Sequence, residues 1–179
     1  MSTHVAFLRA INVGGRNSLP MKTLKVMFEA LGCRNVRTYI QSGNVVFEAT
    51  DAVARKVPKA IQAAIQKHAG FTVPVVTRSA AELAKAAQAH AFAKKTKAAK
   101  ALHFAFLADV PAAERVALLD PKRSPPDEFK VIGRDIHLYL PNGVAPSKLT
   151  NVYLDSKLET VSTLRNWATV QKLLEMCEE

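Results

Sequence analysis

The order of strand-like and helix-like segments in the first 78 residues restricts the fold more than any other feature of the sequence. Apolar runs alternate with amphipathic patterns, and turn residues separate them: Pro20 suits a first helical turn, and Gly32 suits a helix end. Strands are predicted at 5–11, 36–40, 45–47 and 71–77, and helices at 20–31 and 52–68. This β-α-β-β-α-β order is typical of a ferredoxin-like unit.

The second half repeats this order of elements without repeating the sequence. Ser79 and Glu82 form the S-x-x-E pattern of a capping box, which predicts a helix to about residue 90. Strands are then predicted at 102–107, 129–132 and 136–140, and helices at 111–119, 147–158 and 164–176. No final strand matches 71–77. We therefore expect an α+β fold, a tandem duplication of ferredoxin-like subdomains, the second incomplete or modified, with extra C-terminal helices.

The length and composition favour one globular molecule. With 179 residues, of which 49% are hydrophobic and 22% charged, the chain can bury a core without a metal or disulfide. We expect a single compact unit over 1–179, which contains a first half (1–78), a helix and basic connector (79–100), and a second half with the C-terminal helices (101–179).

The charge balance points to anionic partners. Lysine and arginine total 25 against 15 acids, a net charge of +10 that attracts nucleic acids, acidic lipids and phosphorylated small molecules without choosing among them. The alternative is a soluble basic protein with no nucleic-acid role. The two cysteines form no C-x-x-C pair, and no apolar run approaches the roughly 18 residues of a membrane helix. We expect a cytoplasmic protein without a membrane partner, and the oligomeric state is left open.

A polar loop with two glycines joins the first strand to the first helix. Backbone N–H groups in such a loop, next to the positive end of a helix, bind anions well, and flanking arginines would add charge-assisted hydrogen bonds. The alternative is a tight turn in which the glycines only supply positive φ angles. The sequence matches no nucleotide-binding fingerprint. The candidate ligand-binding residues here are Arg9, Asn12, Gly14, Gly15, Arg16 and Asn17.

Two further groups of polar residues are candidates for the same role. The hairpin tip offers Gln41, Ser42 and Asn44, whose polar groups either contact a ligand on the first loop or only form the turn. The other group is Lys148, Arg165 and Asn166, which the pattern places at the starts of the last two helices. A cation at a positive helix end indicates a carboxylate or bound anion nearby.

Catalytic patterns are weak. The five histidines are scattered without metal-ligand spacing, no G-x-S-x-G nucleophile elbow occurs, and no local pair of acids suggests acid–base chemistry. We therefore predict no metal and no cofactor, and catalytic residues stay unknown.

Three motifs carry a resemblance to a known family. They are Phe7–Met21 with its Ile-Asn-Val-Gly-Gly core, Val36–Phe47 with Gln-Ser-Gly-Asn, and Thr163–Val170 with Arg-Asn-Trp. Together they resemble the bacterial family called domain of unknown function 1697. The resemblance covers essentially the whole chain and implies two tandem ferredoxin-like subdomains. It implies no activity, substrate or catalytic residue.

Three functional hypotheses follow. The first is binding of an anionic, phosphate-containing ligand or a nucleic acid at polar loops near helix N-termini. The second is a small-molecule enzyme with a cleft between the halves, where arginines and amides orient an anionic substrate. The third is a structural or interaction protein whose polar loops only lock the fold.

Overall fold

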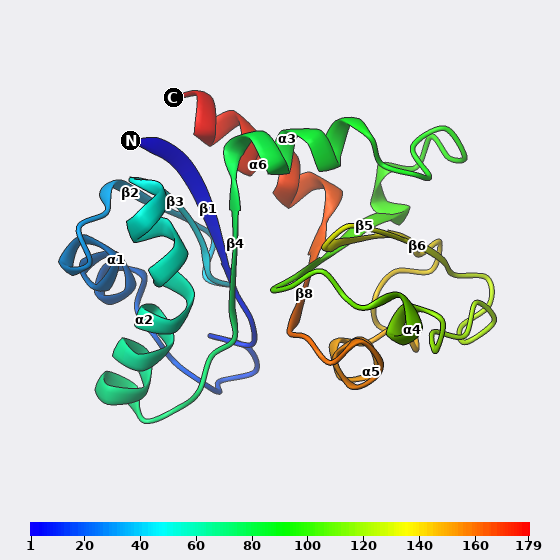
Figure 1. Cartoon of the computed structure of the whole chain (residues 1–179), viewed down its shortest axis with the longest axis horizontal. Helices are drawn as coiled ribbons and strands as arrows, with labels where there is room; N and C mark the ends of the chain where they lie inside the picture. Colours follow the sequence, from blue (N-terminus) through cyan, green and yellow to red (C-terminus); the bar gives the residue numbers. More distant parts are fainter. The chain divides into compact units, whose positions relative to one another are not determined.

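The computed structural model describes residues 1–179 and shows a mixed α+β protein with two four-stranded antiparallel sheets and six α-helices (Figure 1). The chain divides into two compact units. The first is Met1–Ala84 together with Lys172–Glu179, and the second is Lys85–Gln171.

The first unit consists of one sheet and two helices. Its elements are β1 (Ser2–Leu8), α1 (Met21–Ala30), β2 (Arg34–Tyr39), β3 (Asn44–Ala49), α2 (Asp51–Ala69) and β4 (Val75–Ser79). The strand order is β2-β3-β1-β4, and every neighbouring pair is antiparallel. The predicted elements of residues 1–78 are thus confirmed in type and order.

Helices α1 and α2 cover one face of this sheet (Figure 1). Strand residues alternate between faces, so every second residue of β1 and β3 meets the helices. The resulting core is fully buried and includes Ala6, Leu8, Val45, Phe47, Leu24, Phe28, Val57, Ile61 and Ile65. Burying each large apolar side chain contributes about 1.5–3 kcal/mol, so this layer is the main source of the unit's stability.

Local signals fix the ends of α2. Thr50 caps its N-terminus, with its side-chain oxygen accepting from the Val53 N–H at 3.3 Å, and Gly70 ends it in the left-handed conformation at φ 78°. Pro58 lies inside the helix, which continues past it to Ala69. The predicted helix over 52–68 is therefore one element that begins at Asp51.

The second unit has a sheet of its own, and helix α3 (Ala80–Gln88) leads into it. The other elements are β5 (Leu102–Leu107), α4 (Ala113–Val116), β6 (Glu128–Ile132), β7 (Asp135–Tyr139), α5 (Asn151–Leu158) and β8 (Ser162–Asn166). Helix α6 (Trp167–Glu178) begins in this unit, and its residues from Lys172 on belong to the first unit. The strand order is β6-β7-β5-β8, again antiparallel throughout. A buried core of Ala105, Leu107, Ile136, Leu138, Leu154 and Leu158 joins one sheet face to α5.

The expectation of a missing fourth strand in the second half is wrong. Residues 162–166 form β8, which pairs with β5 from His103↔Asn166 to Leu107↔Ser162. The helix predicted over 164–176 therefore begins only at Trp167, and the one predicted over 147–158 begins at Asn151. Pairing with a distant strand outweighs the helical spacing of the apolar residues, because strand propensity depends on context.

The predicted capping box at the start of α3 is confirmed. The Glu82 N–H donates to Ser79 Oγ at 3.1 Å, and the Ser79 N–H donates to Glu82 Oε2 at 2.8 Å. None of the helices combines the length and the apolar character needed to cross a membrane.

Candidate functional site

Two asparagine side chains hold the loop of residues 10–20, between β1 and α1. Asn12 Nδ2 donates to the carbonyls of Leu19 at 2.9 Å and Gln41 at 2.8 Å, and its Oδ1 accepts from the Leu19 N–H at 2.7 Å. Asn17 Nδ2 donates to the Ala10 carbonyl at 2.9 Å. Both asparagines have φ 51°, a left-handed conformation that asparagine tolerates better than most residues. Both amide groups therefore bond to the protein's own backbone, and that of Asn12 also reaches the hairpin tip.

The hairpin tip of residues 40–43 packs against the 10–20 loop. The Leu8 N–H donates to the Gly43 carbonyl at 2.8 Å, and a Cβ on Gly43 would lie 2.8 Å from atoms of Leu8 and Ile11. The buried Asn44 donates through Nδ2 to the Tyr39 carbonyl at 3.2 Å and to Ser42 Oγ at 3.1 Å. The structure thus brings the two predicted loops together.

The tip of the 10–20 loop is exposed. Gly14, Gly15 and Arg16 lie at the surface, in a turn that the Arg16 N–H closes onto the Val13 carbonyl at 3.0 Å. Both glycines have positive φ, and nothing lies within 4 Å of where a Cβ would be. The space around this turn is open to a ligand.

Helix α1 begins directly after the loop without a cap. Its first residue is Met21, Pro20 precedes it, and no side chain caps its N–H groups. No acid lies in its first turn, where Lys22 is exposed. The first N–H groups of a helix have no partner within the helix and carry a partial positive charge, so this end attracts anions.

The other predicted residues of the first unit surround this loop. Gln41 is exposed, while Ser42 and Arg9 are half-buried. The Arg9 N–H donates to the Pro74 carbonyl at 3.0 Å, which extends the pairing of β1 with the segment before β4. Among the predicted residues of the first unit, Gly14, Gly15, Arg16 and Gln41 are therefore the ones that face solvent.

The structure corrects the interpretation of Arg165 and Asn166. Both lie in β8, not in a first helical turn. Arg165 Nη1 donates to Thr163 Oγ1 and to the Leu164 carbonyl, each at 2.8 Å, and burial lowers the pKa of Arg165 to about 10. Asn166 Oδ1 accepts from the Thr169 N–H at 2.8 Å, so its amide caps α6. Arg165 is therefore not a cation at a helix start, and its position does not indicate a bound anion.

Lys148 does not lie at a helix start either. Helix α5 begins three residues later, at Asn151, and Thr150 caps it by accepting from the Tyr153 N–H at 3.2 Å. The Lys148 N–H donates to the buried Ser124 Oγ at 2.9 Å. Lys148 is an exposed loop residue of the second unit, and its backbone has a structural partner.

The structure assembles three histidines that are scattered along the sequence. In the second unit, the rings of His90 and His137 stack with centroids 4.9 Å apart. His90 Nε2 lies 3.0 Å from the His103 carbonyl, and His137 Nδ1 accepts from the Ala91 N–H at 2.9 Å. No spacing pattern could have found this cluster, because its members come from separate elements.

Burial keeps these histidines uncharged. It lowers the pKa of His90 and His103, and it lowers the pKa of His137 to about 4, with the neighbouring His90 as the next cause. Trp167 packs edge-on against His90, with centroids 5.8 Å apart. The cluster is a packed part of the second unit's interior, and no group of histidine, cysteine and acidic side chains in the structure could hold a metal ion.

The two cysteines do not provide a reactive nucleophile. Both are free thiols. Burial raises the pKa of Cys33 to about 11 and raises that of Cys177 as well, which disfavours the reactive thiolate. The 10–20 loop, with the exposed Arg16 and the uncapped start of α1, is therefore the candidate site for binding an anion.

Comparison with known proteins finds one matching family of unknown function and a similar solved structure. The model of the family described as protein of unknown function (DUF1697) matches residues 1–137. The solved structure of conserved bacterial protein SP0830 from Streptococcus pneumoniae is similar, with a TM-score of 0.71 and 21% identity over 98% of each chain. At this identity the likeness concerns the fold alone. No curated protein matches the sequence.

Proposed function

The chain belongs to the DUF1697 family of proteins of unknown function, and from this premise we propose that it binds a phosphate-containing ligand at the 10–20 loop. The phosphate belongs either to a small molecule or to a nucleic acid. The observation that carries the proposal is the uncapped start of α1, without an acid in its first turn, directly after an exposed loop.

Three kinds of donor would meet the ligand at this place. Gly14 and Gly15 present backbone N–H groups at an open turn, the first turn of α1 adds its own N–H groups, and Arg16 and Lys22 supply charge. Backbone donors at a helix start bind phosphate without a dedicated side-chain cage. A charged, multi-oxygen ligand fits this set better than a neutral one does.

The test is an NMR titration of the full chain with inorganic phosphate, pyrophosphate and a mononucleotide. We expect saturable shifts at the amides of Gly14, Gly15 and Lys22. Arg16→Gln should weaken binding about 10-fold, since one charge-assisted hydrogen bond is lost.

Arg34→Gln is the matched control, because it removes the same charge from an exposed residue of the same unit. It should leave the titration unchanged. Shifts that never saturate, or equal weakening by both variants, would contradict a site at this loop. Pyrophosphate binding without mononucleotide binding would favour a small molecule over a nucleic acid.

The second candidate is that the polar loops only stabilise the fold. Three side-chain amides that bond to groups of the protein itself favour this alternative. The side chains of Asn12, Asn17 and Asn44 all donate hydrogen bonds to backbone carbonyls, and that of Asn44 also donates to Ser42 Oγ. A flat phosphate titration, combined with loss of stability in Asn44→Ala, would support this alternative. The enzyme hypothesis predicts turnover, and the structure offers it no identified nucleophile or acid–base pair.

We also infer a finer description of the molecule. The support for a tandem ferredoxin-like duplication is that both sheets place their strands in the same relative order, third and first in the middle, with antiparallel neighbours. Two free cysteines agree with a bacterial protein that works in a reducing cytoplasm.

A further inference from the structure

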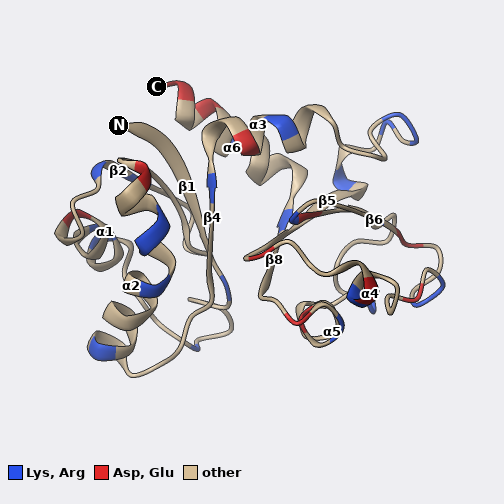
Figure 2. Ribbon diagram, in the orientation of Figure 1, with Lys and Arg blue, Asp and Glu red and all other residues tan.

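Four cations lie on the outer side of α2, three in its first half and one near its end. Arg55, Lys56, Lys59 and Lys67 are exposed, and we call them the cationic face of α2 (Figure 2). At 3.6 residues per turn they fall within an arc of about 120° and extend over about 18 Å. A regular helix holds these side chains in fixed relative positions, which a flexible loop would not do.

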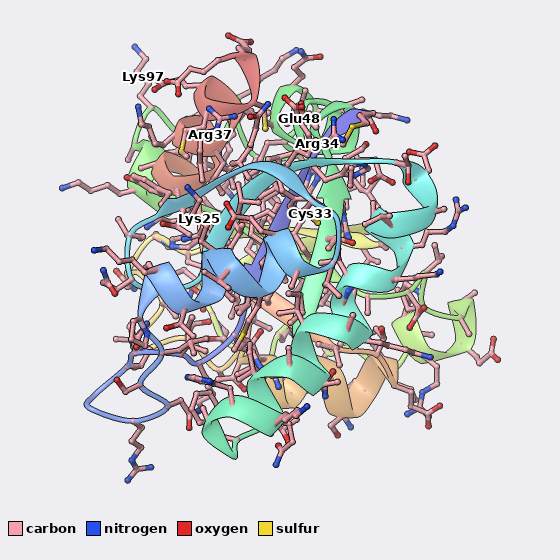
Figure 3. The ribbon with its side chains drawn as sticks, turned by 90° about the vertical axis from the view of Figure 1, so that its left-hand side faces the viewer. Lys25, Cys33, Arg34, Arg37, Glu48 and Lys97 are labelled. Atoms are coloured by element: carbon pink, nitrogen blue, oxygen red, sulfur yellow. The ribbon has the colours of Figure 1, made fainter.

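This face carries an excess of positive charge. None of the four side chains forms an ion pair, and the only acid in α2 is Asp51 in its first turn. Helix α1 packs beside α2 and adds the exposed Lys22 to the same helix layer, which Figure 3 views from outside, whereas Lys25 of α1 pairs with Glu29 at 3.9 Å. The concentration of like charge lowers the stability slightly through repulsion, and it attracts anionic partners.

The face is unsuited to a membrane or to a protein hot spot. The apolar side of α2 is used in the core, where Val57, Ile61 and Ile65 are fully buried, so the helix has nothing to insert into a bilayer. The exposed residues that share this side of the helix with the cations are small or polar: Ala52, Ala63 and Gln66. Protein interfaces depend on buried aromatic or large apolar anchors, and this face has none.

A nucleic-acid backbone can bind through positive charge alone, and this face provides that charge. Lysine and arginine that contact phosphates supply sequence-independent affinity. Single-stranded nucleic acid is usually held by aromatic side chains that stack on its bases, and no aromatic lies among these residues. We propose that the cationic face of α2 is a docking surface for a nucleic-acid duplex, held through its phosphates without reading the base sequence.

This surface is separate from the 10–20 loop, so the proposal stands without the loop site. The test measures the affinity of the full chain for a short labelled DNA duplex, the equivalent RNA duplex and the single strands, between about 50 and 200 mM salt. We expect duplex affinity to fall steeply with salt and to be independent of sequence. Arg55→Gln/Lys56→Gln/Lys59→Gln should weaken binding by about 10- to 100-fold and reduce the salt slope by about 2.7.

The matched control is Lys94→Gln/Lys97→Gln/Lys100→Gln. These lysines are also exposed and without ion pairs, and the change in net charge is identical. The control should keep the affinity within about 3-fold and the salt slope within about 1. Equal losses in both triple variants would show attraction by net charge alone and would overturn the proposal, as would absence of duplex binding.

Two further arms separate the partner classes and guard against misfolding. Binding to polyglutamate or to phosphatidylserine vesicles as tight as binding to duplex, at equal charge concentration, would overturn the nucleic-acid assignment.

Lysine acetylation of the unmodified protein needs no variant. Protection of Lys56, Lys59 and Lys67 by duplex, but not of Lys94 and Lys97, is the expected pattern, and the reverse pattern would overturn the proposal. Arg16→Gln should leave duplex binding nearly intact, which keeps this result distinct from the loop test.

Discussion

At the scale of single residues, Gly43 is the position where backbone and packing requirements coincide. Its φ of 86° is unfavourable for any side chain, and a Cβ there would lie 2.8 Å from Leu8 Cβ and Ile11 Cδ1. This close approach lets the hairpin tip rest on the end of β1, and Asn12 then joins the two loops through the Gln41 carbonyl. The geometry of the candidate site therefore depends on residue 43 being a glycine, without a side chain.

Gly43→Ala should destabilise the protein by about 2–4 kcal/mol, since the strain of the left-handed conformation adds to overpacking. Urea unfolding measures this loss. Gly14→Ala is the control, because Gly14 has φ 57° but nothing within 4 Å of its Cβ position. It should cost about 1 kcal/mol, from conformation alone. Equal losses in the two variants would show that packing at Gly43 is unimportant.

At the scale of elements, the junction between β8 and α6 shows how one residue ends a strand and starts a helix. Asn166 is the last residue of β8, paired with His103, and its Oδ1 accepts from the Thr169 N–H at 2.8 Å. The helix begins at the next residue, Trp167. The side chain thus satisfies a helical N–H that would otherwise lack a partner.

Asn166→Ala should lower the free energy of unfolding by about 1 kcal/mol, because the cap is lost. Asn166→Ser should recover most of the loss, since serine caps about as well as asparagine. Thermal and urea denaturation of the three proteins provide the measurement. A serine variant no more stable than the alanine variant would show that capping is not what Asn166 contributes.

At the scale of the whole molecule, the buried histidines make stability depend on pH. Burial lowers the pKa of His4, His90 and His103, and it lowers that of His137 to about 4 from an ordinary 6.5. The unfolded chain therefore binds more protons than the folded one between about pH 6.5 and 4. Stability is complete above this window and is lost as the pH falls through it.

For His137 alone, the loss on acidification amounts to about 3 kcal/mol. Urea unfolding of His137→Gln at about pH 7.5 and about pH 5 should show a smaller difference between the two conditions than the unmodified protein shows. His68→Gln is the control, because His68 is exposed at the end of α2. The stability difference between the two pH values should be the same for His68→Gln as for the unmodified protein. A decrease in this difference as large as that of His137→Gln would show that the buried histidine is not its cause.

Local sequence signals were sufficient wherever the determinant lies within about four residues. The capping box of Ser79 and Glu82 starts α3, Gly70 ends α2, and the glycine-bearing runs form the loops at 10–20 and 40–43. The exposed cations of α2 also follow from helical spacing, because the apolar residues opposite them are four apart. Caps, turns and periodicity act between near neighbours, so the chain alone encodes them.

The sequence by itself determined the family, the α+β class and the elements of the first half. Only the tertiary structure decided that 162–166 is a strand, because its partner β5 lies more than fifty residues earlier in the chain. It also decided that the asparagines of the loops bond to carbonyls, and that His90 and His137 stack. These outcomes depend on non-local pairing and burial, whose free energy no window of neighbouring residues contains.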